Sequence, residues 1–154
     1  MDHPLRSLVE YWQHQDMRIA PAATELEIQA LELRYQIQIE REFRAYLLTV
    51  NGMLQSANDQ CDSNLFAFWQ IDRIRPVGEE CPELQAAPNE RQYFVFADYM
   101  IWSWAYAIDL NANSATSGRV ILVGGLRQQC VAFSFFDFVH LYMQDSRQLY
   151  AAPA

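Results

Sequence analysis

The chain contains no lysine, and its positive side chains, apart from histidine, are 11 arginines. Without a side-chain amine, Schiff-base catalysis and the lysine of a phosphate-binding loop are excluded. The nucleophile pattern G-x-S-x-G and the glycine-rich nucleotide patterns are also missing. Three histidines, His3, His14 and His140, are scattered and lack the H-E-x-x-H spacing of zinc enzymes. The sequence therefore predicts no metal and no cofactor.

Cysteine is scarce as well. Cys61, Cys81 and Cys130 are widely spaced, with no C-x-x-C pair, and are predicted to be free thiols. One enzymatic alternative pairs Cys130 as nucleophile with His140 as base. The sequence offers no third residue pattern to orient such a base, and free cysteines are usually packing residues, so a non-enzymatic protein is the favoured interpretation.

The N-terminus lacks the basic region, apolar run and small-residue cleavage site of a secretory signal. A cytoplasmic location is therefore expected. The chain of 154 residues is 51% hydrophobic, enough to bury a full core, and a single domain over residues 1–154 is predicted. Its net charge of -8 disfavours binding to nucleic acid or to an anionic membrane, which both need clustered cations. A basic protein partner suits this charge, although acidity also simply keeps a protein soluble.

The most apolar stretch runs from Tyr93 to Leu110, YFVFADYMIWSWAYAIDL. Asp98 and Asp109 would be costly in lipid, and its aromatic residues alternate with small ones, so a β-hairpin is predicted in place of a membrane span. Strict alternation puts Phe94, Phe96 and Asp98 on one side of the first strand. The connection is expected at residues 99–103, and a layer of helices is expected to cover the bulky face.

Helices are predicted around this hairpin from apolar spacing and capping residues. A first helix follows Pro4, and a second begins after Thr24, which forms a capping box with Glu27. Its apolar positions are expected at Leu26, Ile28, Ala30, Leu31, Leu33 and Tyr35. A third helix begins near Glu40 and is stopped by a left-handed Gly52. A last helix starts at Ser134, and the tail from Ser146 to Ala154 is expected to fray.

Short strands are predicted over 65–71, 119–123 and 131–133, and the segment 78–92 is expected to be an exposed loop or a short helix. Helices thus come first, then several strands, then a closing helix. This order predicts an α+β fold with a largely antiparallel meander sheet, covered by the N-terminal helices and by the C-terminal helix.

Five segments of the chain resemble the SUKH superfamily of Smi/Knr-like domains. IEREFRAYLLTVNG resembles its amphipathic helix ending in N-G, and the resemblance continues through FAFWQI, YFVFADY, WAYAIDL and AFSFFDFVHLYMQD. It extends from Leu26 to Asp145, and the order and spacing of the segments are more specific than any one of them. One departure is Ile39-Glu40, where the family has Leu-Pro at the helix start.

The resemblance implies a protein-binding role without catalysis. Many bacterial members are immunity proteins that bind and neutralise a toxin, and fungal relatives regulate cell-wall assembly. An acidic surface would steer such a protein onto a basic toxin, for example one of the nuclease type. The alternatives are a regulatory interaction module without a toxin partner and a small-molecule-binding protein.

Candidate partner-binding residues come from the polar loops and from the hairpin. Trp102 in the connection is expected to protrude as an anchor, since tryptophan is enriched at binding hot spots. Asp98 is expected either to cap the following turn or to be buried and functional, and a carboxylate pair with Asp109 stays a further alternative. The acidic candidates in the loops are Asp59, Asp62, Glu79, Glu80 and Glu83.

Overall fold

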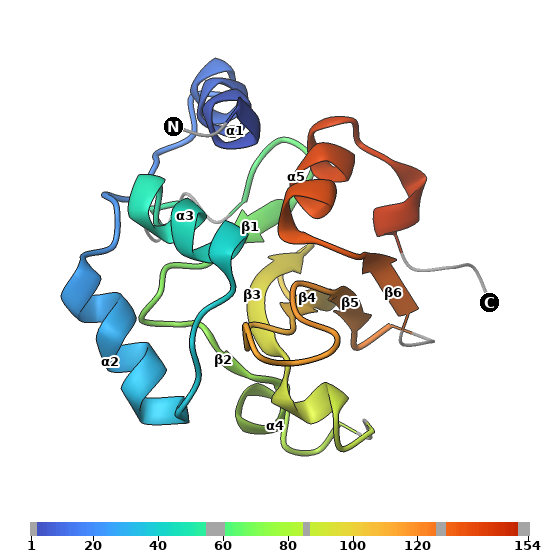
Figure 1. Ribbon diagram of the computed structural model, residues 1–154. Coiled ribbons are helices and arrows are strands. Elements are labelled where there is room, and N and C mark those ends of the chain that lie inside the picture. Colours follow the sequence, from blue (N-terminus) through green and yellow to red (C-terminus); the bar gives the residue numbers. More distant parts are fainter. Residues whose placement is uncertain (1–2, 55–60, 85–86, 126–128, 151–154) are drawn as a thin grey trace.

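The computed structural model describes residues 3–54, 61–84, 87–125 and 129–150 and combines five helices with a six-stranded sheet (Figure 1). The helices are α1 (His3–His14), α2 (Glu25–Tyr35), α3 (Arg41–Thr49), α4 (Val77–Glu80) and α5 (Phe135–Met143). The strands are β1 (Phe66–Phe68), β2 (Arg75–Pro76), β3 (Phe94–Tyr99), β4 (Trp104–Ile108), β5 (Val120–Val123) and β6 (Gln129–Ala132). Two 3-10 turns are η1 (Glu90–Gln92) and η2 (Arg147–Leu149).

The sheet has the order β1-β3-β4-β5-β6, and β2 pairs with β3 beside β1. Every pairing is antiparallel, and β3 to β6 follow one another as a meander. The predicted α+β fold is therefore confirmed. No helix in the described part of the chain has the length and apolar character needed to cross a membrane.

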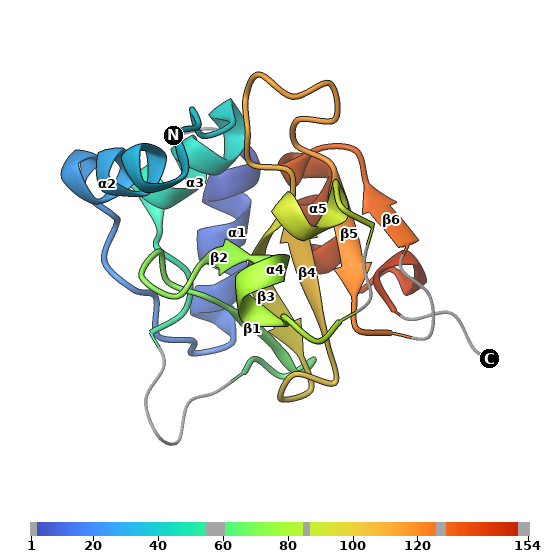
Figure 2. The ribbon, with the colours of Figure 1, turned by 90° about the horizontal axis from the view of Figure 1, so that it is seen from below.

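The two faces of the sheet are covered differently. Helices α1, α3 and α5 lie over one face, and α4 lies over the other (Figure 2). On the first face, the rings of Phe43 from α3, Phe96 from β3 and Phe135 from α5 meet edge to face, with centroids 4.9–5.7 Å apart. Such ring pairs add about 0.5–1.5 kcal/mol each beyond the burial of their area. The aromatic alternation in the sequence thus builds the interface between helices and sheet.

A bulge in β3 changes which side chains share a face. The register of β3 with β4 shifts between Val95 and Ala97, which inserts one residue and reverses the alternation beyond it. Phe96 and Tyr99 both contact aromatic rings on the helix side, those of Phe138 and Tyr150. Asp98 is instead on the other side of the sheet. The prediction that Asp98 shares a face with Phe94 and Phe96 is therefore wrong.

Helix α2 has the predicted capping box: the Thr24 hydroxyl accepts the N–H of Glu27, and Glu27 accepts the N–H of Thr24. Its predicted apolar positions are only partly buried. Ile28 and Leu31 face the core, whereas Leu26 and Leu33 are 76% and 80% exposed. Because α2 lies at the margin of the molecule and packs on α3 from one side, its other side stays outside the core (Figure 1).

The remaining boundaries differ from prediction at the ends of elements. Strand β1 ends at Phe68, short of the predicted residue 71, and the short-helix alternative for 78–92 is confirmed in part by α4 and η1. The tail is more ordered than expected as far as Tyr150. Leu149 is fully buried, and its carbonyl accepts a hydrogen bond from the hydroxyl of Tyr106, which fixes η2 against the sheet. The prediction of fraying for this part of the tail is wrong.

Candidate protein-binding site

Three of the predicted partner-binding residues meet at the turn between β3 and β4. The indole N–H of Trp102 donates to Oε1 of Glu80 at 3.3 Å, which joins the turn to α4. The backbone N–H of Trp102 donates to Oδ1 of Asp98 at 3.2 Å. Asp98 therefore caps the turn that follows its strand, as one of the two sequence hypotheses predicted.

Asp98 is also buried, with 5% of its surface exposed. Its other oxygen, Oδ2, accepts the indole N–H of Trp69 at 2.7 Å, and Nη2 of Arg73 lies 4.0 Å away. The guanidinium of Arg73 in turn covers the ring of Trp69 at 3.7 Å from the centroid. A buried carboxylate is stable when its oxygens are paired in this way. Asp98 thus holds the turn and the end of β1 together.

The turn itself has an uncommon backbone. Met100, Ile101 and Trp102 have φ angles of 50°, 52° and 62°, so three consecutive residues are left-handed and none is glycine. A β-branched residue such as Ile101 rarely adopts this conformation. The turn is closed by the N–H of Ser103, which donates to the carbonyl of Tyr99 at 2.9 Å, and by the hydroxyl of Ser103, which donates to the carbonyl of Met100 at 2.9 Å.

This conformation brings apolar side chains to the surface. Ile101 is 78% exposed, Met100 is 46% exposed, and Leu65, whose carbonyl accepts the N–H of Met100, is 37% exposed. These three residues form the turn patch. The sequence interpretation missed Ile101, and the available signal was an apolar pair in a turn without glycine, asparagine or proline.

Trp102 does not protrude as expected. Its side chain is half-buried, and its ring packs so closely on Gly124 that a β-carbon there would lie 3.0 Å from Cζ3. The left-handed turn directs Ile101 outward and lays Trp102 over the end of β5. Its role in the site is therefore to support the turn patch.

The other predicted residues are spread over several environments. Glu79 accepts the hydroxyl of Tyr35 at 2.5 Å, and burial together with Glu79 raises the pKa of Tyr35. Glu80 also binds Nε of Arg75 at 2.5 Å, while Glu83 is exposed. Asp59 lies outside the described residues.

Asp62 was expected to lie in an exposed loop, and this prediction is wrong. Its side chain is 4% exposed and accepts hydrogen bonds from the hydroxyl of Tyr142 and from the backbone N–H of Phe66. Tyr142 in turn accepts the indole N–H of Trp12 at 2.8 Å. Asp62 therefore ties α1, β1 and α5 together inside the protein.

The carboxylate-pair alternative finds no matching geometry among the described residues. Asp98 pairs with Ala105 in the hairpin, whereas Asp109 follows its far end, so they do not form a carboxylate pair. No described group of histidine, cysteine and acidic side chains is arranged to hold a metal. Burial, Glu80 and Glu83 raise the pKa of Cys81 to about 11, so its thiol stays protonated near neutral pH.

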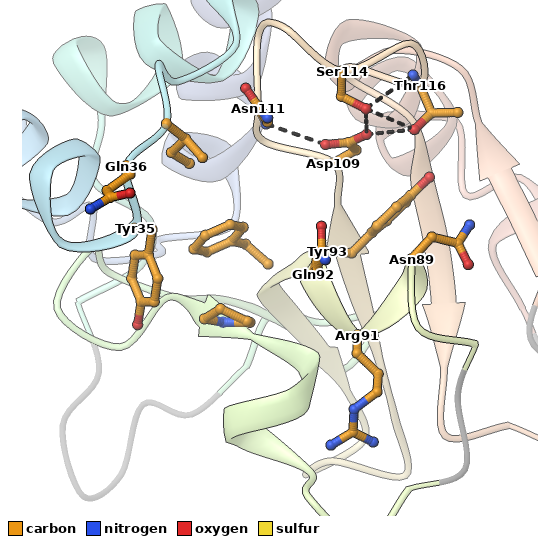
Figure 3. Close-up of a pocket in the computed structure, with 13 residues that line it drawn as sticks. Tyr35, Gln36, Asn89, Arg91, Gln92, Tyr93, Asp109, Asn111, Ser114 and Thr116 are labelled. Atoms are coloured by element: carbon orange, nitrogen blue, oxygen red, sulfur yellow. Dashed lines mark hydrogen bonds between the residues drawn. The ribbon is translucent and has the colours of Figure 1, made fainter.

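A pocket of about 510 Å³ lies at the other end of β3 (Figure 3). Its walls come from the end of α2, from η1 and from the loop after β4, with Tyr35 and Tyr93 on opposite sides. At its rim Asp109 accepts the hydroxyls of Ser114 at 2.6 Å and Thr116 at 2.5 Å. The charge of Asp109 is thus used within the loop, and the lining offers mainly amide and hydroxyl groups.

Comparison with known proteins agrees with this architecture. No curated protein sequence matches the chain. Residues 22–140 match the model of the SMI1 / KNR4 family (SUKH-1), which spans α2 through most of α5 and includes the whole sheet. The chain therefore belongs to the SMI1 / KNR4 family (SUKH-1).

Proposed function

We propose that this protein is an immunity protein that binds and neutralises a toxin through the turn patch. Membership in SUKH-1 supports a toxin-immunity or related interaction role. The observation that carries the proposal is the exposed Ile101 at the tip of a firmly supported, left-handed turn. Catalysis by the protein itself is not part of the proposed function, because direct binding is sufficient to block a toxin.

The conformational energy of the turn supports this proposal. A left-handed residue other than glycine is disfavoured by roughly 1–2 kcal/mol, so three in succession are maintained only by the contacts around them. Asp98, Ser103 and Glu80 supply those contacts. Strained backbone of this kind clusters at binding sites, where it presents side chains in one fixed arrangement. A rigid apolar tip loses little entropy when a partner covers it.

The charge of the protein favours a basic partner. The chain carries a net charge of -8. The half-exposed Glu79 belongs to α4, which Trp102 joins to the turn, and the exposed Glu83 follows α4. Complementary charge raises the rate of association more than the final affinity. A toxin that acts on nucleic acid carries a basic surface and is the proposed partner class.

Replacing Ile101 by aspartate is expected to weaken toxin binding about 100-fold, or roughly 2–3 kcal/mol, because an apolar anchor at an interface centre is lost. Stability should be retained, since aspartate tolerates the left-handed conformation better than isoleucine does. The measurement is coexpression with the product of the neighbouring gene, scored by growth rescue, followed by calorimetric titration of the purified pair.

Phe133→Asp is the matched control, because Phe133 is 73% exposed and follows β6, away from the turn. It should bind and rescue like the wild type. Equal binding by both variants would contradict the assignment of the turn patch. If the product of the neighbouring gene were harmless or did not bind, the proposed immunity function would be contradicted. Capture of several housekeeping proteins from native extract would then favour a regulatory module.

A further inference from the structure

Helix α2 carries apolar residues on two opposite sides. Ile28 and Leu31 face the core, while Leu26, Ala30 and Leu33, spaced i, i+4 and i+7, form an exposed stripe. These three residues are called the outer stripe. In both views α2 lies at the margin of the molecule, and no described element covers its outer side (Figures 1 and 2). A helix with two apolar sides is typical of a helix with a second packing partner.

We propose that the outer stripe binds the outer stripe of a second copy, with the two α2 helices antiparallel and a two-fold axis beside Ala30. The sequence of the stripe is nearly symmetric about this residue, with Leu26 four positions before it and Leu33 three positions after it. A two-fold interface requires such self-complementarity. The small side chain of Ala30 at the crossing point allows the two helices to approach closely. Leu26 of each copy then lies beside Leu33 of the other.

The surface beside Leu33 has room for a leucine. A shallow hollow of about 390 Å³ is lined there by Leu33, Gln36, Ile37 and their neighbours. In the antiparallel pair, Leu26 of the second copy lies level with residue 34, which places it between Leu33 and Ile37. The hollow therefore receives Leu26 as a hole receives a knob in paired helices.

The charged residues that flank the stripe favour the same arrangement. Glu27 and Arg34 are seven residues apart on one flank, so an antiparallel pair brings Glu27 of each copy beside Arg34 of the other. Within each chain Glu27 also accepts the N–H of Thr24, and Arg34 lies 3.8 Å from Glu79, so the contact between copies adds to these two. On the opposite flank, Glu25 is paired with Arg44 at 2.6 Å, and Glu32 accepts the N–H of Ile39 at 2.9 Å. These internal contacts reduce the repulsion between the carboxylates that would meet there.

The predicted dimer is weak and leaves the turn patch accessible. A single helix pair covers less than the roughly 800 Å² per partner of a stable interface, so dissociation is expected in the micromolar range. Figure 2 shows α2 at the upper left of the molecule and the β3–β4 turn at its bottom, so the outer stripe and the turn patch are separate surfaces. The dimer is thus independent of toxin binding, and either proposal can fail without the other.

Sedimentation equilibrium from low micromolar to near-millimolar concentration tests the dimer. The mass of the wild type should rise toward that of two chains, and Leu33→Glu should stay monomeric throughout. Leu54→Glu is the matched control, because Leu54 is 38% exposed and lies outside α2, and it should associate like the wild type. A wild type that is monomeric at every concentration, or Leu33→Glu that associates unchanged, would overturn the proposal.

A cysteine at the proposed axis tests the geometry. In a chain with Cys61→Ser and Cys130→Ser, Ala30→Cys should give a disulfide-linked dimer under mild oxidation, since the two β-carbons would meet at the short distance a disulfide needs. Gln13→Cys on the exposed side of α1 should not crosslink. Failure of Ala30→Cys to crosslink overturns the antiparallel pairing. Loss of toxin binding by Leu33→Glu would also overturn it, by assigning the stripe to the toxin.

Discussion

Replacing Gly52 by alanine is expected to lower the free energy of unfolding by at least about 3 kcal/mol. Gly52 has a φ of 71°, in the left-handed region. A β-carbon at this position would lie 2.6 Å from the carbonyl oxygen of Trp69 and 2.8 Å from that of Phe68. Both atoms belong to the backbone at the end of β1, which cannot rotate away as a side chain can. The substitution therefore adds conformational strain and forces α3 and β1 apart.

Gly78→Ala is the matched control, because Gly78 lies within α4 and its added β-carbon would meet its neighbours at an ordinary 3.5 Å. It should be neutral or stabilising by up to about 1 kcal/mol, since alanine favours the helix and restricts the unfolded chain. Urea unfolding of both variants measures the difference. If Gly52→Ala were as stable as Gly78→Ala, the close packing of residue 52 on β1 would be wrong.

The order of elements could be predicted because each signal is local. The capping box at Thr24 and the left-handed Gly52 each involve residues within a few positions of one another. Hydrophobic spacing predicted α3 and α5 for the same reason. These features survive in the structure because tertiary packing reinforces the local preference.

The positions of individual side chains depended on nonlocal features. The bulge in β3 moved Asp98 to the α4 side of the sheet, and alternation alone carries no sign of an inserted residue. Leu26 and Leu33 have helical spacing that fits a buried stripe as well as an exposed one. Only the placement of α2 at the margin of the molecule distinguishes the two, and that depends on contacts with a distant part of the chain.

Three of the predicted partner-binding residues lie together in the structure, whereas the most exposed side chain beside them was not among the predicted ones. Asp98, Trp102 and Glu80 do meet, although they come from α4 and from the hairpin. The residue that protrudes is Ile101, because the left-handed backbone reverses the expected directions of the neighbouring side chains. Sequence patterns seldom predict such a conformation, since non-glycine residues rarely adopt it.

Asp62→Ala is expected to destabilise the protein by about 3 kcal/mol or more, because it removes the acceptor for several buried donors. Asp62 accepts the hydroxyl of Tyr142 and the backbone N–H groups of Phe66 and Asn64, the latter at 2.8 Å. Burial and the nearby Asp62 raise the pKa of Tyr142, so its phenol stays protonated and needs an acceptor. Urea unfolding at neutral pH measures the loss.

A double-mutant cycle with Tyr142→Phe separates this network from simple loss of packing. Tyr142→Phe removes the donor to Asp62 and also the acceptor for the indole N–H of Trp12. Once the hydroxyl is absent, Asp62→Ala leaves one buried donor fewer without a partner, so the two losses should fall short of additivity by about 0.5–3 kcal/mol. Strictly additive losses would mean that the two side chains contribute independently.

The pH dependence of stability tests the environment of Asp62. Burial raises its pKa above the ordinary value of 3.8, and the hydrogen bonds from Tyr142, Phe66 and Asn64 act in the opposite direction without cancelling the effect. Between the unfolded-state pKa and the higher folded-state pKa, the folded protein holds more protons than the unfolded chain, so stability falls with rising pH. The contribution of this carboxyl is therefore fully present below the unfolded-state pKa and is lost as the pH rises through the folded-state pKa.

Asp62→Asn cannot titrate at this position, so subtracting its unfolding free energy from that of the wild type at each pH cancels the other ionisable groups. The difference should shift against the wild type as the pH rises from about 3 through the acidic range, and should level off once Asp62 is ionised in both states. A difference that moved in favour of the wild type over this range would mean that hydrogen bonding outweighs burial. The hydrogen-bonded carboxylate of Asp62 would then stabilise the fold most at neutral pH, when it is fully charged.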